Sequence, residues 1–407
     1  MPETAAALMH FPLDWYRQMR AHEPVAWDAK FGSWNVFRYD DALRILSDPA
    51  TFSSQVGEPG KGLPSIVGMD EPRHRQLRGL VNQAFTPRIV AELGPRITEV
   101  AGELLDEVLA RGSFDLIQDF AYPLPIRIIA ELLGIPVEEQ ATFRRWSETL
   151  ITGPRTDAVR GRSYAQERSD SLRDLNDYFR GKLAERARDP RPDLMSRLLA
   201  AQVDGERLAE NDLLEFCRLL LIAGYETTAC LIGNTVLALH EHPAIAAEVR
   251  ADPALVAGAV EESLRCYPSV AGTMRVATAD TQVGAQPIAK GQSVIVWLGS
   301  ANYDEAHFVE PERFDVRRSP NRHLAFGFGI HFCVGAPLAR LEARIALGLL
   351  LARLPRFERS PASPGSPASP GSPASPGSPA SPGSPVEPVE HVESPFIFGV
   401  KHFHMRV

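Results

Sequence analysis

The feature that most restricts the fold is a long, mostly apolar run in the middle of the chain. Residues 211–240 read NDLLEFCRLLLIAGYETTACLIGNTVLALH. Apolar side chains fall on nearly every face of the helix that this run predicts, which is typical of a core helix. A helix of about thirty residues, at 1.5 Å per residue, is roughly 45 Å long and crosses a whole domain. We expect Asn211 to cap this helix and Pro243 to end it.

The rest of the chain predicts further helices and a smaller set of strands. Helical periodicity or composition marks residues 88–110, 123–133, 137–151 and 160–188, the segment from Asp40 to Leu46, and the segment after Cys333 to about Leu354. Short strand patterns occupy PVAWD and SWNVFRY near the start and residues 274–298, with turns at Gly284 and Gly291. Residues 57–68 are rich in glycine and proline and predict a long loop.

Composition and charge exclude several classes of protein. The chain has 407 residues, 44% of them hydrophobic, which is enough for a large core, and we expect one domain over residues 1–407. A formal net charge of −8 disfavours nucleic-acid binding. The four cysteines show neither a CxxC pair nor zinc spacing and are interpreted as reduced thiols of a cytoplasmic protein. Residues 1–20 resemble no targeting segment, and no uninterrupted apolar run approaches about 18 residues, so we expect no membrane attachment.

Residues 361–384 are four copies of PASPGS. Proline at every third position favours polyproline II, and this composition cannot form a packed core. We interpret residues 361–385 as a low-complexity surface excursion within the domain. The alternative is a docking segment for an aromatic groove on a partner.

One cysteine lies in an unusual setting. Residues 323–342 read HLAFGFGIHFCVGAPLARLE, so Phe326, Gly329, Cys333 and Gly335 fill the pattern F-x-x-G-x-x-x-C-x-G. A lone cysteine is usually a small buried residue, and FGFG is compatible with an ordinary turn. Here a helix follows at once, and a helix N-terminus favours a thiolate. A thiolate in this position can be an axial iron ligand.

This segment resembles the cysteine-ligand loop of the cytochrome P450 family, specifically the soluble bacterial type, and the likeness covers essentially the whole chain outside the repeat. It implies a mainly α fold with a small β-rich lobe, and haem b between the long helix and the cysteine loop. It also implies that Cys333 is the iron ligand, and that Phe326 and Gly335 lie beside the sulfur. The implied reaction is insertion of one atom of dioxygen into a hydrophobic small molecule, by hydroxylation or epoxidation. Electrons would come from NAD(P)H through a ferredoxin and a reductase.

A second motif is Ala223-Gly224-Tyr225-Glu226-Thr227-Thr228, in the middle of the long helix. A buried acid is costly unless it is used or satisfied, although an ordinary buried polar patch is the alternative. Thr227 can bond back to the carbonyl of Ala223 and open the helix locally, while Gly224 would leave room for a small ligand. The resemblance implies that Ala223 lies against the haem, that Thr227 steadies dioxygen and that Glu226 relays protons. The peroxide-using branch of the family generally lacks this pair, so its presence favours dioxygen.

A third set contains groups that would bind the two haem propionates. His74 and Arg78 are four residues apart on one helix face, Arg275 lies in a strand-like segment, and His331 is in the cysteine loop. Hydrogen bonds from arginine to carboxylate are strong and directional. The resemblance assigns all four to propionate contacts, and plain surface positions are the alternative.

Two further groups of residues have structural or docking roles in this interpretation. Glu262 and Arg265 face each other on a helix, and with Arg313 they resemble the triad that braces the cysteine loop in this family. Arginines near the cysteine side predict a basic docking patch for ferredoxin, with scattered surface charge as the alternative; they are Arg73, Arg75, Arg340 and Arg344. The run from His240 to His242 lacks the H-E-x-x-H spacing and is interpreted as a helix end.

The substrate is only broadly defined by the sequence. By analogy, the pocket would be lined by residues 57–68, Ala223, Thr227, Val270 to Thr273 and Phe396 to Phe398. Their apolar character indicates a fatty acid, terpenoid, steroid or macrolide. We expect a monomer. The alternatives are a peroxide-driven peroxygenase and a haem-based sensor or carrier.

Overall fold

The computed structural model describes residues 12–56, 66–139, 164–203, 205–357, 389–392 and 394–406, together with parts of 142–149. The PASPGS repeat and residues 57–65 of the predicted loop lie outside these ranges. The single domain over residues 1–407 and the excursion at 361–385 therefore stay predictions.

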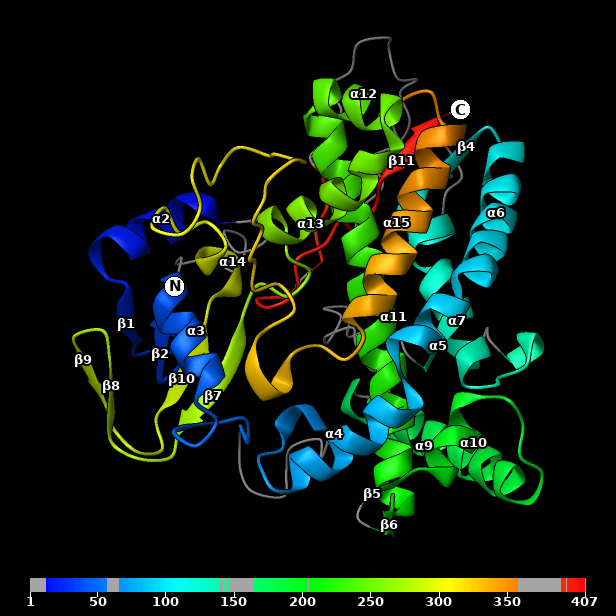
Figure 1. The fold of residues 1–407 in the computed structure, drawn as a ribbon, viewed down its shortest axis with the longest axis horizontal. Helices are drawn as coiled ribbons and strands as arrows, with labels where there is room; N and C mark the ends of the chain where they lie inside the picture. Colours follow the sequence, from blue (N-terminus) through cyan, green and yellow to red (C-terminus); the bar gives the residue numbers. More distant parts are fainter. Residues whose placement is uncertain are drawn as a thin grey trace.

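The predicted long helix is confirmed as α11 (Glu210–Glu241), which runs through the centre of the helical part (Figure 1). It contacts α7 (Pro123–Leu132), α13 (Val256–Cys266) and α15 (Ala336–Arg353), while α6 (Gly94–Ala110) packs on α7 and α15. The remaining long or outer helices are α4 (Arg73–Ala84), α5 (Pro87–Glu92), α9 (Tyr164–Arg188), α10 (Leu194–Ala200) and α12 (Pro243–Ala251).

The ends of α11 only partly follow the sequence prediction. The expected cap at Asn211 is wrong, because the helix begins one residue earlier and Ala209 precedes it. Asp212 takes over part of the capping, since its carboxylate accepts the N–H of Ala209 at 3.3 Å. At the other end the helix stops before Pro243, as predicted. Among the described helices, α11 alone is long and apolar enough to cross a membrane, but 61% of its most apolar window is buried, as expected of a core helix.

The β-rich part contains a five-stranded sheet in the order β1-β2-β10-β7-β3. Only the β2–β10 pair is parallel, with Ser33 opposite Ser293. The strands are β1 (Val25–Asp28), β2 (Ser33–Val36), β3 (Phe52–Ser53), β7 (Thr273–Ala277) and β10 (Ser293–Val296). Helices α2 (Leu13–His22), α3 (Tyr39–Ser47) and α14 (Leu298–Ala301) belong to this part.

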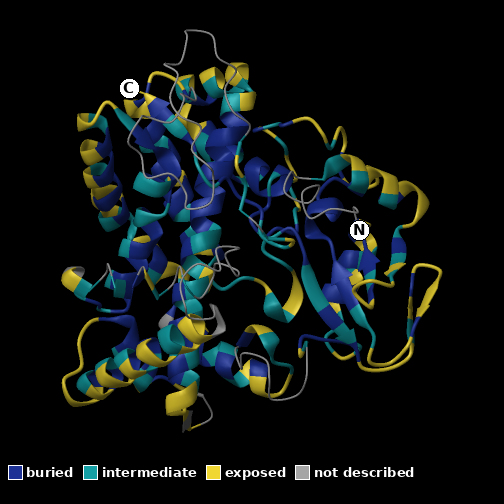
Figure 2. Cartoon of the chain, turned by 180° about the vertical axis from the view of Figure 1, so that it is seen from behind, coloured by how far each residue is buried: buried dark blue, intermediate teal, exposed yellow. Residues whose placement is uncertain are grey.

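Short strand pairs complete the fold. The predicted turn at Gly284 joins β8 (Thr281–Val283) to β9 (Gln286–Ile288) and has a positive φ of 55°. β4 (Ser113–Asp115) pairs with β11 (His404–Arg406), and β5 (Gln202–Val203) pairs with β6 (Glu206–Arg207). Figure 2 shows buried residues inside both the helical part and the sheet, with exposed residues on the outer helices. The cysteine loop, which contains Cys333 and precedes α15, connects the β-rich part to the helical part.

Candidate active site

The cysteine loop is a closed turn that ends at the first residue of α15. The Cys333 N–H donates to the Phe326 carbonyl at 3.0 Å, and the Gly327 N–H donates to Leu324 at 2.8 Å. Gly329 has a φ of 71°, and a Cβ on it would lie 2.5 Å from the Leu46 carbonyl oxygen in α3. Glycine is therefore needed here for the backbone conformation and for packing on α3.

The Cys333 side chain is partly buried and lies close to backbone N–H groups and to a cation. Burial raises the pKa of the thiol, while the backbone N–H groups of Gly335 and Ala336 and the Arg78 guanidinium favour the thiolate. The other three cysteines are free thiols in the core. Burial raises the pKa of Cys217 and of Cys266 to about 12. Cys333 thus combines partial exposure with donors from a helix N-terminus, an arrangement that suits a metal-binding thiolate.

Phe326 is held in place by Arg340, one of the arginines of the predicted docking patch, which is itself anchored by Glu261. The Arg340 guanidinium lies 4.5 Å from the centre of the Phe326 ring. Arg340 donates to both oxygens of Glu261 at 2.7 and 2.9 Å, and His323 pairs with the same carboxylate at 3.1 Å. Burial opposes the ionisation of Glu261, but the hydrogen bonds from His323 and Arg340 outweigh it and lower its pKa to about 2. The only sequence feature that could have pointed to Glu261 was its position beside Glu262 in a predicted helix.

The four expected propionate-binding residues come together around the cysteine loop. The His74 and His331 rings are 4.2 Å apart, and Arg78 donates to the Phe332 carbonyl at 2.6 Å. Arg275 is buried and donates to the Met274 carbonyl at 2.7 Å. Burial, followed by the charges of His74 and Arg275, lowers the pKa of His331 to about 4. His74, Arg78 and Arg275 are therefore all within electrostatic reach of His331.

The Glu226–Thr227 pair lies at the middle of α11. The Thr227 hydroxyl donates to the Ala223 carbonyl at 2.6 Å, as predicted, and Thr228 makes the same bond to Gly224 at 2.8 Å. The helix nevertheless continues unbroken, so the predicted local opening is not observed. Ala223 is exposed on the turn that carries Thr227. Burial raises the pKa of Glu226 to about 7, so this carboxyl is about half protonated near neutral pH.

Gly224 has a different role from the one that the sequence suggested. A Cβ at this position would lie 2.6 Å from the end of the Ile129 side chain in α7. The glycine therefore allows α11 to pack closely on α7, and the interpretation that it leaves room for a ligand is wrong.

The bracing triad contains a different arginine from the predicted one. Arg265 donates to both oxygens of the fully buried Glu262, at 2.9 and 2.7 Å. The third cation is Arg318, whose Nε lies 3.1 Å from the same carboxylate. The Arg313 side chain points outward instead, is 64% exposed and pairs with Glu310. Arg313 contributes only its backbone carbonyl, which accepts from Arg265 at 3.2 Å.

Two predicted pocket segments lie side by side. Val270 forms a bridge with Ile397, and the Ala271 N–H donates to the Phe396 carbonyl at 2.8 Å. The Ser269 hydroxyl donates to the Thr227 carbonyl at 2.8 Å, which connects this region to the middle of α11. The apolar segments and the acid–alcohol pair therefore belong to one region of the molecule.

Comparisons with known proteins agree with this geometry. The family model for cytochrome P450 matches residues 154–370. "Cytochrome P450 109" of Bacillus spizizenii is 42% identical over 398 residues, covering 98% of this chain and 92% of the relative. The erythromycin C-12 hydroxylase of Saccharopolyspora erythraea is 42% identical over 350 residues, covering 84% and 87%.

Similar structures have also been solved. That of CYP109E1 from Bacillus megaterium in complex with corticosterone has a TM-score of 0.86 and 34% identity, covering 98% of this chain and 99% of the other. The chain belongs to the cytochrome P450 family. This P450 is accordingly a monooxygenase, and its cofactor is haem b.

The residues of this P450 fit a haem group. The Nε2 atoms of both His74 and His331 are buried, and among the described residues neither has a hydrogen-bond partner. Buried polar atoms are normally paired, so these two nitrogens indicate a missing polar partner beside Arg78 and Arg275. The propionate carboxylates of haem would complement this group of donors. Cys333 provides the soft ligand that a haem iron accepts.

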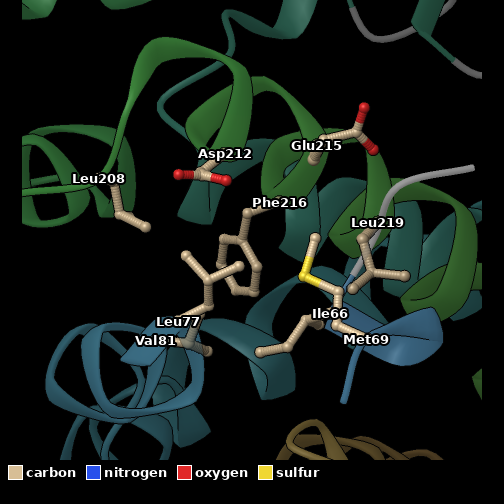
Figure 3. Close-up of a pocket in the computed structure, with 9 residues that line it drawn as sticks. All are labelled: Ile66, Met69, Leu77, Val81, Leu208, Asp212, Glu215, Phe216 and Leu219. Carbon is tan, nitrogen blue, oxygen red and sulfur yellow. The ribbon is translucent and has the colours of Figure 1, made fainter. Parts of the chain in front are cut away.

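This P450 has a small cavity beside Ile66 of the predicted loop and a larger one remote from Cys333. The one in Figure 3 lies between α4 and α11, where Leu77 and Val81 face Phe216. It encloses about 20 Å³, room for about one water molecule, and so it cannot hold a substrate. A cavity of about 510 Å³ lies against α12 and the C-terminal end of α15. Cys333 precedes the opposite end of that 18-residue helix, so the second cavity is remote from the sulfur.

Other predicted features have mixed outcomes. The side chain of Arg73 pairs with Asp212, and Arg340 is engaged by Glu261, so their charges are partly neutralised. The docking patch therefore stays a prediction that rests mainly on the exposed Arg75 and Arg344.

The prediction that His240 lies at a helix end is confirmed. It is in the last turn of α11, where its ring makes a hydrogen bond with the Phe357 carbonyl at 2.6 Å.

Proposed function

We propose that this P450 uses dioxygen, and electrons from NAD(P)H delivered by a ferredoxin and its reductase, to hydroxylate or epoxidise a hydrophobic small molecule in the cytoplasm. The observation that carries the proposal is the protonatable Glu226 directly before Thr227 on α11. A carboxyl with a pKa near the working pH is suited to proton transfer. Peroxide-driven chemistry does not require an external supply of protons and electrons, so this pair supports the use of dioxygen.

In this proposal the cysteine loop and the four residues around it would hold the haem. Cys333 binds the iron, and the N–H groups of Gly335 and Ala336 stabilise the thiolate. Phe326 shields the sulfur, and His74, Arg78, Arg275 and His331 hold the propionates. When bound, haem would supply the oxygen-activating chemistry, and Cys333 as its thiolate ligand would tune that chemistry.

In this proposal, Glu226 and Thr227 on α11 deliver protons. Burial keeps the Glu226 carboxyl protonated at pH values below about 7, so it can donate a proton. The Thr227 hydroxyl donates to the Ala223 carbonyl, which leaves its oxygen lone pairs available as acceptors. We infer that Thr227 passes a proton toward the reaction site and that Glu226 replenishes it.

The substrate class is inferred from the side chains that line the predicted pocket and from the compounds that relatives bind or act on. Val270 to Thr273 and Phe396 to Phe398 give one wall with mainly apolar side chains and few charges. One relative acts on the macrolide erythromycin, and another binds corticosterone. We infer a large, mostly apolar ring compound of the macrolide or steroid type.

A matched pair of variants tests the function. Thr227→Val removes the hydroxyl with little change in shape, and Thr228→Val removes the same kind of back-bond one residue later. With a ligand found by the substrate-induced spin-state shift, we expect Thr227→Val to lower product formed per NADPH by about tenfold or more. Thr228→Val should stay close to the wild-type ratio.

The pH profile gives a second reading of the same experiment. Above pH 7 more of Glu226 is ionised and unable to donate, so coupled turnover of the wild type should fall as the pH rises. The Glu226→Gln variant should have slow coupled turnover, and this turnover should not decline as the pH rises. Equal coupling in Thr227→Val and Thr228→Val, or steady turnover with peroxide and none with reductase partners, would contradict the proposal.

A further inference from the structure

Metal-binding side chains also gather at the C-terminal strand pair. Asp115 ends β4 and His404 begins β11, and the two are direct partners across the antiparallel pair. His402 lies two residues before His404, and side chains two apart in an extended chain point to the same face. The two imidazole rings are stacked, with centres 5.9 Å apart and planes 5° apart. One ligand atom from each of the three residues lies within 4.8 Å of the others.

The carboxylate of Asp115 is already oriented by the backbone. Its Oδ1 accepts the N–H groups of Ile117 at 2.9 Å and of Phe403 at 3.1 Å. The other oxygen, Oδ2, points toward the Nδ1 atom of His402. Carboxylate ligands of metal ions are commonly fixed by such outer hydrogen bonds.

An ion pair between Asp115 and His402 would by itself explain part of this arrangement. It does not require His404, whose ring is nevertheless brought to the same point. Two imidazoles and one carboxylate are a common ligand set for zinc and similar divalent ions, with a fourth position left for water. Ligand atoms around a tetrahedral zinc ion lie about 3.3 Å apart, so small side-chain rotations would close the site.

We propose that Asp115, His402 and His404 form a binding site for a zinc-type divalent cation that fastens β11 to β4. The site differs from the Cys333 site in its elements and its ligands. The segment that contains His402 and His404 also carries Phe396 to Phe398 of the proposed substrate pocket. Because an ion that binds only the folded chain stabilises it, zinc should raise the thermal midpoint of this P450.

The test uses the untagged, chelator-treated holoenzyme and zinc chloride in a calorimetric titration. We expect one zinc ion per chain, with the affinity lowered at least tenfold in His404→Gln. His404 is the preferred position because Asp115 also holds backbone N–H groups, and Asp115→Asn serves as a second variant. His22→Gln, an exposed histidine at the end of α2, is the matched control and should bind zinc like the wild type. Magnesium should not compete, since it prefers oxygen ligands.

The thermal midpoint of the same proteins provides an independent readout. Zinc should raise it in the wild type and in His22→Gln, but not in His404→Gln. The proposal is overturned if His404→Gln binds zinc as tightly as the wild type, or if the wild type shows no saturable binding at millimolar zinc. Neither result would bear on Cys333 or on the oxygen chemistry.

Discussion

Arg313 and Arg318 are five residues apart in one loop, yet their side chains have opposite surroundings. Arg318 reaches the buried Glu262 carboxylate and also donates to the Val309 carbonyl at 2.9 Å. Arg313 lies at the surface with Glu310. Exposed ion pairs contribute little to stability, whereas a buried carboxylate that loses a cation is left undercompensated.

Alanine substitutions at these two positions should therefore lower the free energy of unfolding by very different amounts. We expect Arg318→Ala to lower the free energy of unfolding by roughly 1.5–3 kcal/mol. Arg313→Ala should change it by no more than about 0.5 kcal/mol. Urea unfolding followed by haem absorbance and by circular dichroism measures both. A cost for Arg313→Ala as large as that for Arg318→Ala would restore the triad predicted from the sequence.

The same pair shows what residue spacing can and cannot predict. The cysteine loop was located correctly because its glycines, its cysteine and the following helix are close in sequence and act locally. The choice between Arg313 and Arg318 depends on how an irregular loop folds back on α13, and no local pattern encodes that. Glu261 was missed for a related reason, because its partner Arg340 is 79 residues away.

At the scale of secondary-structure elements, two helix glycines differ in their contacts. A Cβ on Gly258 in α13 would lie 2.0 Å from the backbone carbonyl oxygen of Val316, which cannot move aside independently. A Cβ on Gly102 in α6 would meet nothing within 4 Å. Gly258 thus allows α13, which carries Glu262 and Arg265, to approach the loop that contains Arg318.

We expect Gly258→Ala to destabilise the protein by about 1–3 kcal/mol, because the added methyl overpacks a backbone contact. Gly102→Ala should instead stabilise it by up to about 1 kcal/mol, since alanine favours the helix. Thermal midpoints of the two variants provide the comparison. A stabilising Gly258→Ala would show that this helix–loop contact is looser than described.

The elements themselves were largely predictable. Long periodic segments such as α9 and α11 were placed within a few residues, because burial and helical spacing act over many positions. The start of α11 was misplaced because Asp212, inside the helix, takes over part of the capping by accepting the Ala209 N–H. The role of Gly224 depends on Ile129, nearly a hundred residues earlier, and was therefore not visible locally.

At the scale of the whole molecule, a buried acid makes stability depend on pH. Glu342 in α15 is 1% exposed, and among the described residues neither carboxylate oxygen has a hydrogen-bond partner. Burial raises its pKa to about 8, compared with an ordinary value of 4.5. Between these values the folded state keeps a proton that the unfolded state has lost. Stability must therefore fall as the pH rises through this window.

We expect Glu342→Gln to remove part of this dependence, because the amide cannot ionise. One such group contributes a slope of at most about 1.4 kcal/mol per pH unit. Glu226, with a pKa of about 7, adds to the slope at lower pH and remains in the variant. Urea midpoints between pH 5 and pH 8 measure the effect. The exposed Glu310→Gln is the control, and an unchanged slope in Glu342→Gln would refute the assignment.

The central claim is that Cys333 binds haem iron as a thiolate. The most direct test is the carbon monoxide difference spectrum of the reduced protein. The wild type and Cys230→Ala, which changes a buried cysteine in α11, should show the strongly red-shifted Soret band of thiolate ligation. Cys333→His should bind haem without that band. A wild-type spectrum without the red-shifted band, or its persistence in Cys333→His, would contradict the account.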